Sequence, residues 1–339
     1  MLDEGGAGGL AFFPIATSVK KRPGMYFGGT GSSAVNNAIY ELISNAIDQY
    51  LMGYATKVKV EVFDSVIKVS DDGRGLPFNA PAPIEHCASL AEFYFLYRHN
   101  LPTADNHAPH VHILSGGLGL AVINAASDYI KVISSDGHRI YRQEFGEGAI
   151  QTPCEIDCIV SDSGTELEFF LDKTLFQVPV PDMPSMRKTL FELAHFYPGL
   201  VVEFQGERFL AERGLLDLAY IRYSALVVGS LSPSRQYFFQ GKENGVQIQV
   251  AALGDSGSTE YKSWVNGVET VEGGVHILGL ERAFLKVGWK PHIALIHVIL
   301  HDPKYAGPSR DTLCHTFITE VVEKLVEESL FEIVKNQRN

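Results

Sequence analysis

The chain has 339 residues, of which 45% are hydrophobic and 20% charged, a composition typical of a globular protein. One hydrophobic core rarely serves so long a chain, so two domains are expected. The net charge of −12 opposes non-specific binding to nucleic acid, because such binding depends on basic side chains that neutralise phosphates.

The apolar segments and the N-terminus exclude two further classes of protein. No apolar run approaches the roughly 20 residues that a membrane-spanning helix needs. The first residues, MLDEGGAGGLAFFP, lack the basic start and the long apolar stretch of a signal peptide. The sequence therefore predicts a cytoplasmic protein that makes no membrane contact.

The four cysteines do not form a recognisable pattern. Cys87, Cys154, Cys158 and Cys314 have neither the spacing of a metal site nor the density of a disulfide framework. We therefore expect buried free thiols.

The first 31 residues are rich in glycine and proline and are expected to form an N-terminal arm rather than a long regular element. Three of its apolar residues, Phe12, Phe13 and Ile15, are candidates for a contact exchanged between two protomers. Packing onto the same protomer is an equally open alternative.

A helix is predicted from Ser32 to about Met52, and it carries an unusual polar stripe. Glu41, Asn45 and Asp48 are spaced i, i+4 and i+7, so they share one helical face among apolar neighbours. Taken alone, such residues could cap neighbouring groups or face water. Context has to decide whether they converge on a ligand.

Two strands follow, 57–63 and 66–70, and the second leads into DDGRG at 71–75. The glycines allow tight turns, and an Asp at a strand end can accept a hydrogen bond from an amino group. Further on, SGGLGLAVINAA at 115–126 is a glycine-rich turn before a helix, a place that suits phosphate. Each motif alone is weak.

Between these motifs the sequence predicts a helix near 89–98 and a long polar segment at 99–113. The segment contains four histidines, which raise the possibility of a metal site. Their irregular spacing and the lack of Cys or carboxylate partners favour a solvated loop. They are His99, His107, His110 and His112.

Strands are predicted over 129–135, 138–145 and 165–171, which completes a mostly antiparallel sheet with helices on one face. From about residue 211 a second α/β pattern begins. It contains strands near 235–252 and 293–300 and ends in an amphipathic helix at about 315–336. The fold class is therefore α+β.

The order of the motifs is more specific than any one of them: a helix with E-x-x-x-N, a strand with D-x-G-x-G, a glycine-rich helix start and a later G-T in a strand. This order resembles the GHKL ATPase superfamily. Longer stretches resemble the ATPase subunit of bacterial gyrase and topoisomerase IV: KRPGMYFGGTG, YELISNAIDQYLMGYA, VSDDGRGLP, VNGVETVEGGVHILGLERA and HDPKYAGPSRDTL.

The resemblance implies a GHKL (Bergerat) α/β sandwich at 32–210, after the arm at 1–31. A transducer domain of ribosomal protein S5 domain 2-like type is expected at 211–339, ending in a long helix.

The resemblance also implies the cofactors ATP and Mg²⁺. Glu41 is then the general base that polarises the attacking water, and Asn45 is a ligand of Mg²⁺. Asp48 is expected beside them, paired with Arg74. In the second domain, Arg310 is expected to reach the γ-phosphate.

At the adenine end, the resemblance implies that Asp71 accepts a hydrogen bond from the amino group, helped by Thr165. Gly75 is expected to give the base close access, with Pro77 and Arg74 in the pocket wall. Gly117 and Gly119 are expected to present backbone N–H groups to the phosphates.

Four departures from the family pattern affect phosphate contacts or the coupling of the domains. The phosphate loop is about three residues shorter, and Leu101-Pro102-Thr103 replaces the lid's Gly-Gly-Lys. The transducer lacks the stretch that normally holds an Arg-Glu-Gly motif. Pro308-Ser309-Arg310 stands where the family has Gln-Thr-Lys.

The resemblance thus predicts an ATP-driven, dimerising gate that serves DNA topology. Nothing in the sequence resembles a DNA-cleaving module, so a separate TOPRIM and cleavage subunit or domain is the expected partner, with DNA held indirectly in the clamp. The alternative is a nucleotide-dependent switch or interaction protein with little or no hydrolysis.

Overall fold

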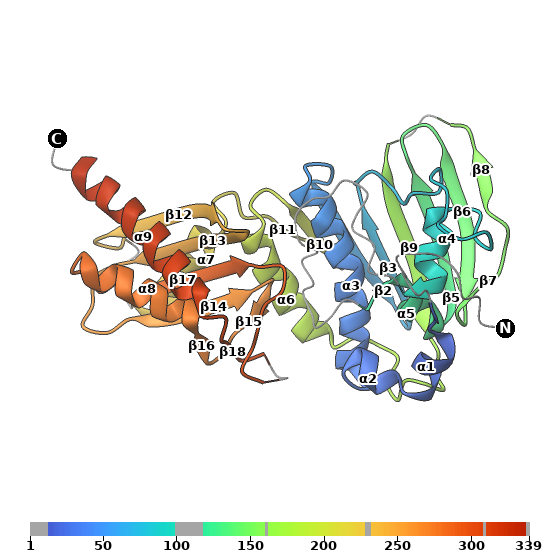
Figure 1. The fold of residues 1–339 in the computed structure, drawn as a ribbon, viewed down its shortest axis with the longest axis horizontal. Helices are drawn as coiled ribbons and strands as arrows, with labels where there is room; N and C mark the ends of the chain where they lie inside the picture. The colour runs from blue at the N-terminus through green and yellow to red at the C-terminus, as the bar shows by residue number, and fades with distance from the viewer. Residues whose placement is uncertain (1–12, 99–117, 160–161, 228–231, 308–309, 337–339) are drawn as a thin grey trace, which may run out of the picture. The chain divides into compact units, whose positions relative to one another are not determined.

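The computed structural model describes residues 13–98, 118–159, 162–227, 232–307 and 310–336 (Figure 1). These residues form two compact units. The first takes in the chain up to Met186 together with Glu203–Glu207, and the second takes in Arg187–Val202 and the residues from Arg208 onward. The domain limits drawn from the sequence, 32–210 and 211–339, remain a prediction.

The first unit is built on one large sheet with the order β11-β10-β2-β3-β9-β5-β6-β7, and β8 pairs with β6. Burial alternates along its strands, as expected when one face is covered and the other meets solvent. The boundary between the units falls within β10 and β11. The strands are β2 (Lys57–Phe63), β3 (Val66–Asp71), β5 (Ser127–Ser135), β6 (Ile140–Gly146), β7 (Ala149–Ile150), β8 (Glu155–Asp157), β9 (Gly164–Leu171), β10 (Val201–Phe204) and β11 (Glu207–Phe209).

Helices gather on one face of this sheet (Figure 1). The longest, α3, is buried along most of its length, and the strand pair β1–β4 joins the start of the described chain to the end of α4. A capping pair begins α4, because Ser89 Oγ accepts the Glu92 N–H at 3.2 Å and Glu92 Oε2 accepts the Ala88 N–H at 2.6 Å. These elements are β1 (Phe13–Pro14), α1 (Ala16–Lys21), α2 (Pro23–Phe27), α3 (Ser32–Leu51), α4 (Leu90–Leu96), β4 (Tyr97–Arg98) and α5 (Leu120–Ala125).

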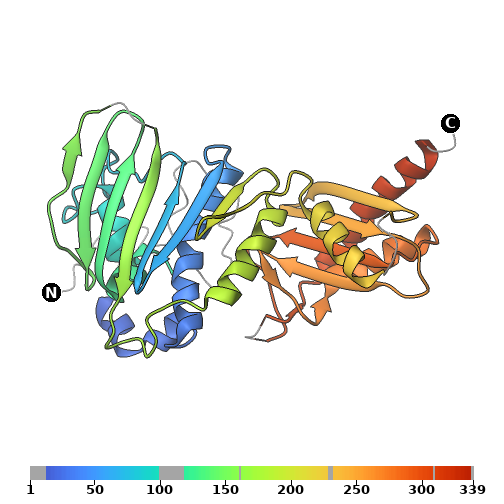
Figure 2. The ribbon, with the colours of Figure 1, turned by 180° about the vertical axis from the view of Figure 1, so that it is seen from behind.

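The second unit contains a sheet with the order β12-β13-β17-β14-β15. Its central strand β17 is buried at every residue, because α8 and α9 cover one face and α6 and α7 the other (Figures 1 and 2). The elements are α6 (Met183–Phe196), α7 (Leu215–Leu226), β12 (Gln236–Glu243), β13 (Val246–Leu253), β14 (Glu260–Val265), β15 (Val268–Glu269), β16 (Gly273–Gly274), α8 (Val275–Lys286), β17 (Ile293–Ile299), β18 (Thr312–Leu313) and α9 (Phe317–Asn336).

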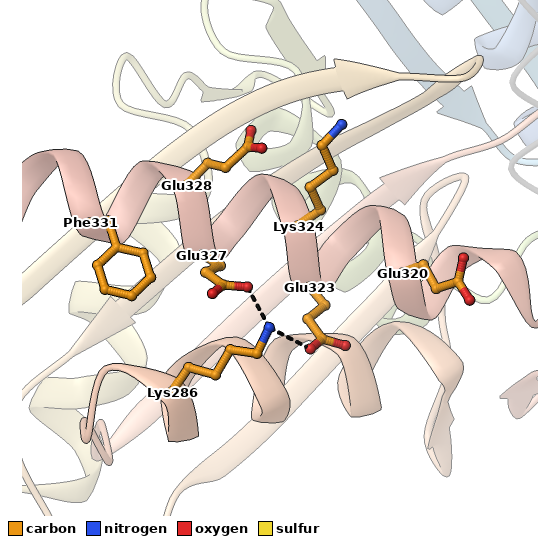
Figure 3. Close-up of a pocket in the computed structure, with 7 residues that line it drawn as sticks. All are labelled: Lys286, Glu320, Glu323, Lys324, Glu327, Glu328 and Phe331. Atoms are coloured by element: carbon orange, nitrogen blue, oxygen red, sulfur yellow. Dashed lines mark hydrogen bonds and ion pairs between the residues drawn. The ribbon is translucent and has the colours of Figure 1, made fainter.

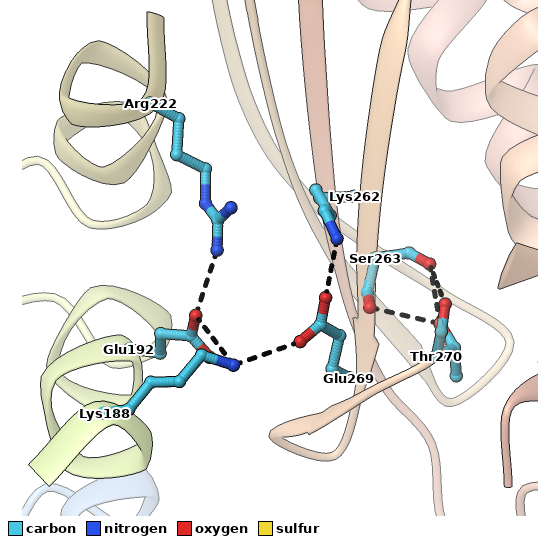
Figure 4. Close-up of polar contacts among 7 residues, drawn as sticks. All are labelled: Lys188, Glu192, Arg222, Lys262, Ser263, Glu269 and Thr270. Carbon is cyan, nitrogen blue, oxygen red and sulfur yellow. Dashed lines mark hydrogen bonds and ion pairs between the residues drawn. The ribbon is translucent and has the colours of Figure 1, made fainter. Parts of the chain in front are cut away.

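A chain of ion pairs ties α6 and α7 to the edge of this second sheet (Figure 4). Glu192 lies 3.0 Å from Arg222, and Lys188 lies 3.3 Å from Glu269, which also meets Lys262 at 3.0 Å. Since the cations and carboxylates neutralise one another, we read the network as structural.

A shallow groove of about 420 Å³ runs between α8 and α9 (Figure 3). Lys286 forms ion pairs with Glu323 and Glu327 across the groove. The groove is lined by Lys286, Glu320, Glu323, Lys324, Glu327, Glu328 and Phe331.

The structure tests the expectation that the four cysteines are buried free thiols. The cysteines are free, but the prediction that they are buried is wrong for most of them: Cys87 is buried, Cys154 is partly exposed, and Cys158 and Cys314 are exposed. Cys158 follows β8 at the outer edge of the sheet, where little covers it.

None of the described helices is both long enough and apolar enough to cross a bilayer.

Candidate functional site

The polar stripe predicted on the helix lies on α3 and is enclosed rather than solvated. Glu41 and Asp48 are each only 8% exposed, while Asn45 between them is partly exposed. A carboxylate is expensive to bury unless something compensates its charge, so the partners of Glu41 are informative. The predicted pairing of Asp48 with Arg74 stays a prediction.

The partners of Glu41 are two backbone N–H groups at the start of α5. Glu41 Oε2 accepts from Leu118 N at 3.0 Å, and Glu41 Oε1 accepts from Gly119 N at 2.9 Å. Such N–H groups have no partner inside the helix and favour negative charge. Although 77 residues separate Glu41 from Leu118, the fold brings the carboxylate directly to the glycine-rich turn.

Gly119 has a backbone conformation that other residues avoid, with φ 75° and ψ 156°. Among the described residues, an added Cβ would meet no atom within 4 Å, so the requirement for glycine comes from the backbone and not from crowding. The turn thus directs two adjacent N–H groups at one point, which the Glu41 carboxylate occupies.

The other end of the candidate site lies where three strands of the sheet meet. Asp71 ends β3, and its register partner on β9 is Thr165, which in turn pairs with Ser134 on β5. Thr165 and Ser134 are buried. Asp71 and Thr165 are therefore neighbours, and their predicted contact with adenine stays a prediction.

Asp71 is poised to accept a hydrogen bond. Burial raises the pKa of its carboxyl to about 6, although the Gly73 N–H, 2.8 Å from Oδ1, opposes that shift. The next residue behaves oppositely. Burial also disfavours the charge of Asp72, but hydrogen bonds from Thr56 and Lys57 outweigh it and hold the pKa of Asp72 below its ordinary value.

The glycines of DDGRG are required by close packing. A Cβ on Gly75, where φ is 80°, would lie 2.3 Å from the carbonyl oxygen of Ser135. The following N–H, of Leu76, donates to Ser134 Oγ at 2.7 Å. Pro77 continues the turn, and its carbonyl oxygen accepts the Ala80 and Ala91 N–H groups at 3.3 Å.

Arg74, between the two glycines, is held by the end of α3 and the turn that follows it. Its backbone N–H donates to Gln49 Oε1 at 3.3 Å, and its guanidinium carbon lies 4.0 Å from the centre of the Tyr54 ring. Its Nη2 also approaches the Met52 sulfur at 3.7 Å.

Sequence reasoning missed three residues of this neighbourhood: Gln49, Tyr54 and Ser134. Gln49 continues the i, i+4 spacing of Glu41 and Asn45, so the helical pattern could have identified it. Ser134 and Tyr54 carry no comparable signal, since their roles depend on strand register and on the path of a turn.

Arg310 belongs to the second unit. Its guanidinium lies 5.2 Å from the Tyr305 ring centre, and burial lowers its pKa from the ordinary value. Its backbone has φ 64°, unusual for a residue other than glycine.

Several predicted residues lie outside the described part of the chain: Gly117, Pro308, Ser309, Phe12 and the four histidines of 99–113. Ile15 is buried in the first unit, which favours local packing for that residue. Within the described ranges, no group of three or more His, Cys, Asp or Glu side chains is placed to hold a metal ion.

Comparison with known proteins gives a consistent result. No family model matches the chain. The DNA gyrase B protein of Borrelia hermsii is 25% identical over 352 residues, covering 94% of this chain and 54% of the relative. That of Thermotoga maritima is 28% identical over 354 residues, covering 93% and 54%. The chain therefore spans about half the length of the curated relatives that it matches.

Solved structures have the same architecture. The 43K ATPase domain of Thermus thermophilus gyrase B, in complex with an aminocoumarin, aligns with a TM-score of 0.77 and 24% identity, covering 96% of this chain and 91% of that one. The topoisomerase IV ATP-binding domain of Francisella tularensis aligns with a TM-score of 0.74 and 22% identity, covering 96% and 93%. The chain thus has the α+β fold of the GHKL ATPase and transducer domains, and its sequence resembles the corresponding region of gyrase B.

Proposed function

We propose that this chain is the ATP-binding and hydrolysing module of a gyrase B-like, type IIA topoisomerase-like protein. The observation that carries the proposal is the contact between Glu41 and the N–H groups of Leu118 and Gly119. It brings the candidate base and the candidate phosphate donors to one point. A phosphate group suits the same donors, because they favour any anion at a helix start.

The base end supports adenine as the other half of the ligand. A partly buried carboxylate on Asp71 provides an acceptor for the exocyclic amino group, and the buried Thr165 beside it provides a hydroxyl. Gly75 lets the turn pack directly against the Ser135 carbonyl oxygen at the end of β5, beside Asp71 and Thr165.

The residues present fit Mg²⁺ as well. Asn45 is partly exposed and lies one helical turn from Glu41, so its amide oxygen is available as a ligand. Mg²⁺ usually takes few protein ligands and completes its shell with water and phosphate oxygens. When bound, it would neutralise the charge of the phosphates.

Glu41 is then the residue that orients and polarises the attacking water. To do so it has to exchange at least one of its two backbone N–H partners, and nucleotide phosphates are suitable replacements at those donors. Arg310 of the second unit is our candidate for a contact with the γ-phosphate. Two further steps complete the proposal. The chain forms a homodimer on ATP binding, with DNA held indirectly in the resulting clamp, and a TOPRIM-containing subunit or domain cleaves the DNA.

The test is ATP turnover with Mg²⁺ over a series of protein concentrations, beside Glu41→Ala. Turnover per protomer that rises with concentration and disappears in the variant would support a dimer-gated ATPase. Tight ATP binding without turnover would instead support the nucleotide-dependent switch. A wild-type chain that binds no ATP would overturn both.

A further inference from the structure

Two of the contacts of Arg74 come from residues to which the sequence analysis gave no role. Gln49 accepts its backbone N–H, and Tyr54 offers an aromatic face to its guanidinium at 4.0 Å. An arginine side chain has many rotamers, and holding it in one of them costs conformational entropy on binding a ligand. A ring that already holds the guanidinium removes part of that cost.

The position of Arg74 makes this relevant to the site. Its neighbour Gly73 donates to Asp71 Oδ1, and its neighbour Gly75 packs against the end of β5. Arg74 therefore belongs to the turn that lies beside the proposed adenine position, and its guanidinium extends from that turn. A planar cation also stacks well on aromatic rings, and a purine base is such a ring.

We propose that Tyr54 is a positioning residue for nucleotide binding, which acts by holding the Arg74 guanidinium at the base end of the site. This inference rests on the proposed function, because it assumes that the base lies beside Asp71. Tyr54 does not touch the nucleotide itself. It pre-orders the residue that does.

A bland alternative is that Tyr54 only covers the surface of the turn. The residue is 48% exposed, so its replacement should leave the fold intact under either reading. The two readings differ in what nucleotide affinity does. They also differ in whether phenylalanine, which keeps the ring, rescues the effect.

The experiment is calorimetric binding of ADP and of adenosine to the full chain and to Tyr54→Leu, Tyr54→Phe and Phe63→Leu. Phe63 is a matched control, since it is also an exposed aromatic residue of the first unit, 62% exposed at the end of β2. We expect Tyr54→Leu to weaken both ligands by the same factor, roughly two- to fivefold for a partly exposed cation–π contact. Tyr54→Phe and Phe63→Leu should bind like the wild type.

A double-mutant cycle with Arg74→Ala shows whether Tyr54 acts through Arg74. In the Arg74→Ala background, Tyr54→Leu should have no further effect on adenosine affinity. An equal loss in both backgrounds would overturn the inference, and so would wild-type affinity in Tyr54→Leu. A wild-type chain that binds neither ligand would overturn the proposed function itself.

Discussion

The two ends of the candidate site are built by different physical means. At the base end, the register of β3, β9 and β5 places Asp71, Thr165 and Ser134 in a row. The turn after β3 packs so closely against β5 that Gly75 has no room for a side chain. At the phosphate end, two N–H groups before a six-residue helix meet a carboxylate from α3.

This difference indicates which end of the candidate site has to rearrange when a nucleotide binds. The base end is preformed, because strand register alone places the Asp71 acceptor beside Thr165 and the turn packs against β5. The phosphate end is satisfied by the protein itself, because Glu41 occupies the donors that a phosphate would need. Binding of a nucleotide should therefore rearrange the phosphate end and leave the base end nearly unchanged.

The largest effect is expected at the phosphate end, from Glu41→Gln. An amide cannot act as the base, so ATP turnover should fall by roughly 10²- to 10⁴-fold. Affinity should be retained or increased, because one amide oxygen competes less well with phosphate for two N–H donors than a carboxylate does. Steady-state turnover and equilibrium binding measure the two quantities separately.

Glu92→Gln is a matched control, because Glu92 is also a buried glutamate that accepts a backbone N–H at a helix start. It should keep turnover per folded molecule. Equal losses of turnover in both variants would mean that Glu41 acts through stability and not through chemistry.

At the base end, Gly75→Ala should be the most damaging change. The added Cβ meets the Ser135 carbonyl oxygen at 2.3 Å and also strains a backbone with φ 80°. We expect a loss of about 2–4 kcal/mol in the free energy of unfolding, together with loss of nucleotide binding. Urea denaturation and calorimetry are the measurements.

Gly53→Ala measures the backbone strain without the steric clash, since Gly53 has φ 79° and an added Cβ would meet no atom of the described residues within 4 Å. Strain alone predicts about 1–2 kcal/mol there and no effect on binding. If Gly75→Ala and Gly53→Ala lose the same free energy of unfolding, close packing is not the reason that the turn requires glycine at position 75.

Asp71 gives the base end a pH dependence. Its pKa of about 6 in the folded chain lies above the roughly 3.9 of an unfolded Asp, so its protonation favours the folded state. That contribution to stability is complete below about pH 4 and is lost as the pH rises through about 6. The ligand depends on the opposite form, because the amino group of adenine is bound best by the carboxylate.

Adenosine affinity should therefore decrease as the pH falls from about 7.5 to about 5. Asp71→Asn should bind roughly tenfold more weakly near neutral pH and should lose most of this pH dependence. A wild-type affinity that is flat over this range would place the adenine amino group elsewhere.

The smallest effect is expected from Ser134→Ala, which leaves the partly buried Leu76 N–H without its acceptor. The free energy of unfolding should fall by about 1–2 kcal/mol, with a modest loss of adenosine affinity. Ser127 is a control of similar burial, because its hydroxyl donates to an Ile123 carbonyl that already accepts the Ala126 N–H. Ser127→Ala should leave affinity unchanged.

Much of the first unit could be predicted from the sequence, because local periodicity determined it. The expected helix from Ser32 is α3, and the expected strands at 57–63 and 66–70 are β2 and β3 within one residue. In contrast, α7 (Leu215–Leu226) was not predicted. Its own apolar residues are spread around most of its circumference, so they form no clear apolar stripe.

The candidate site was predictable in its residue types but not in its contacts. The spacing of Glu41 and Asn45 indicated a shared face, yet the pairing of Glu41 with Gly119 depends on how the chain returns 78 residues later. Likewise Ser134 joins Asp71 only through the register of three strands. Such contacts come from tertiary structure, which a local pattern does not contain.

The most direct test of the central claim is a crystal structure with Mg²⁺ and a non-hydrolysable ATP analogue. We predict that the adenine amino group lies within hydrogen-bond distance of Asp71, and that the Leu118 and Gly119 N–H groups have moved from Glu41 to phosphate oxygens. A nucleotide bound elsewhere, or one bound with both N–H groups still on Glu41, would contradict the account.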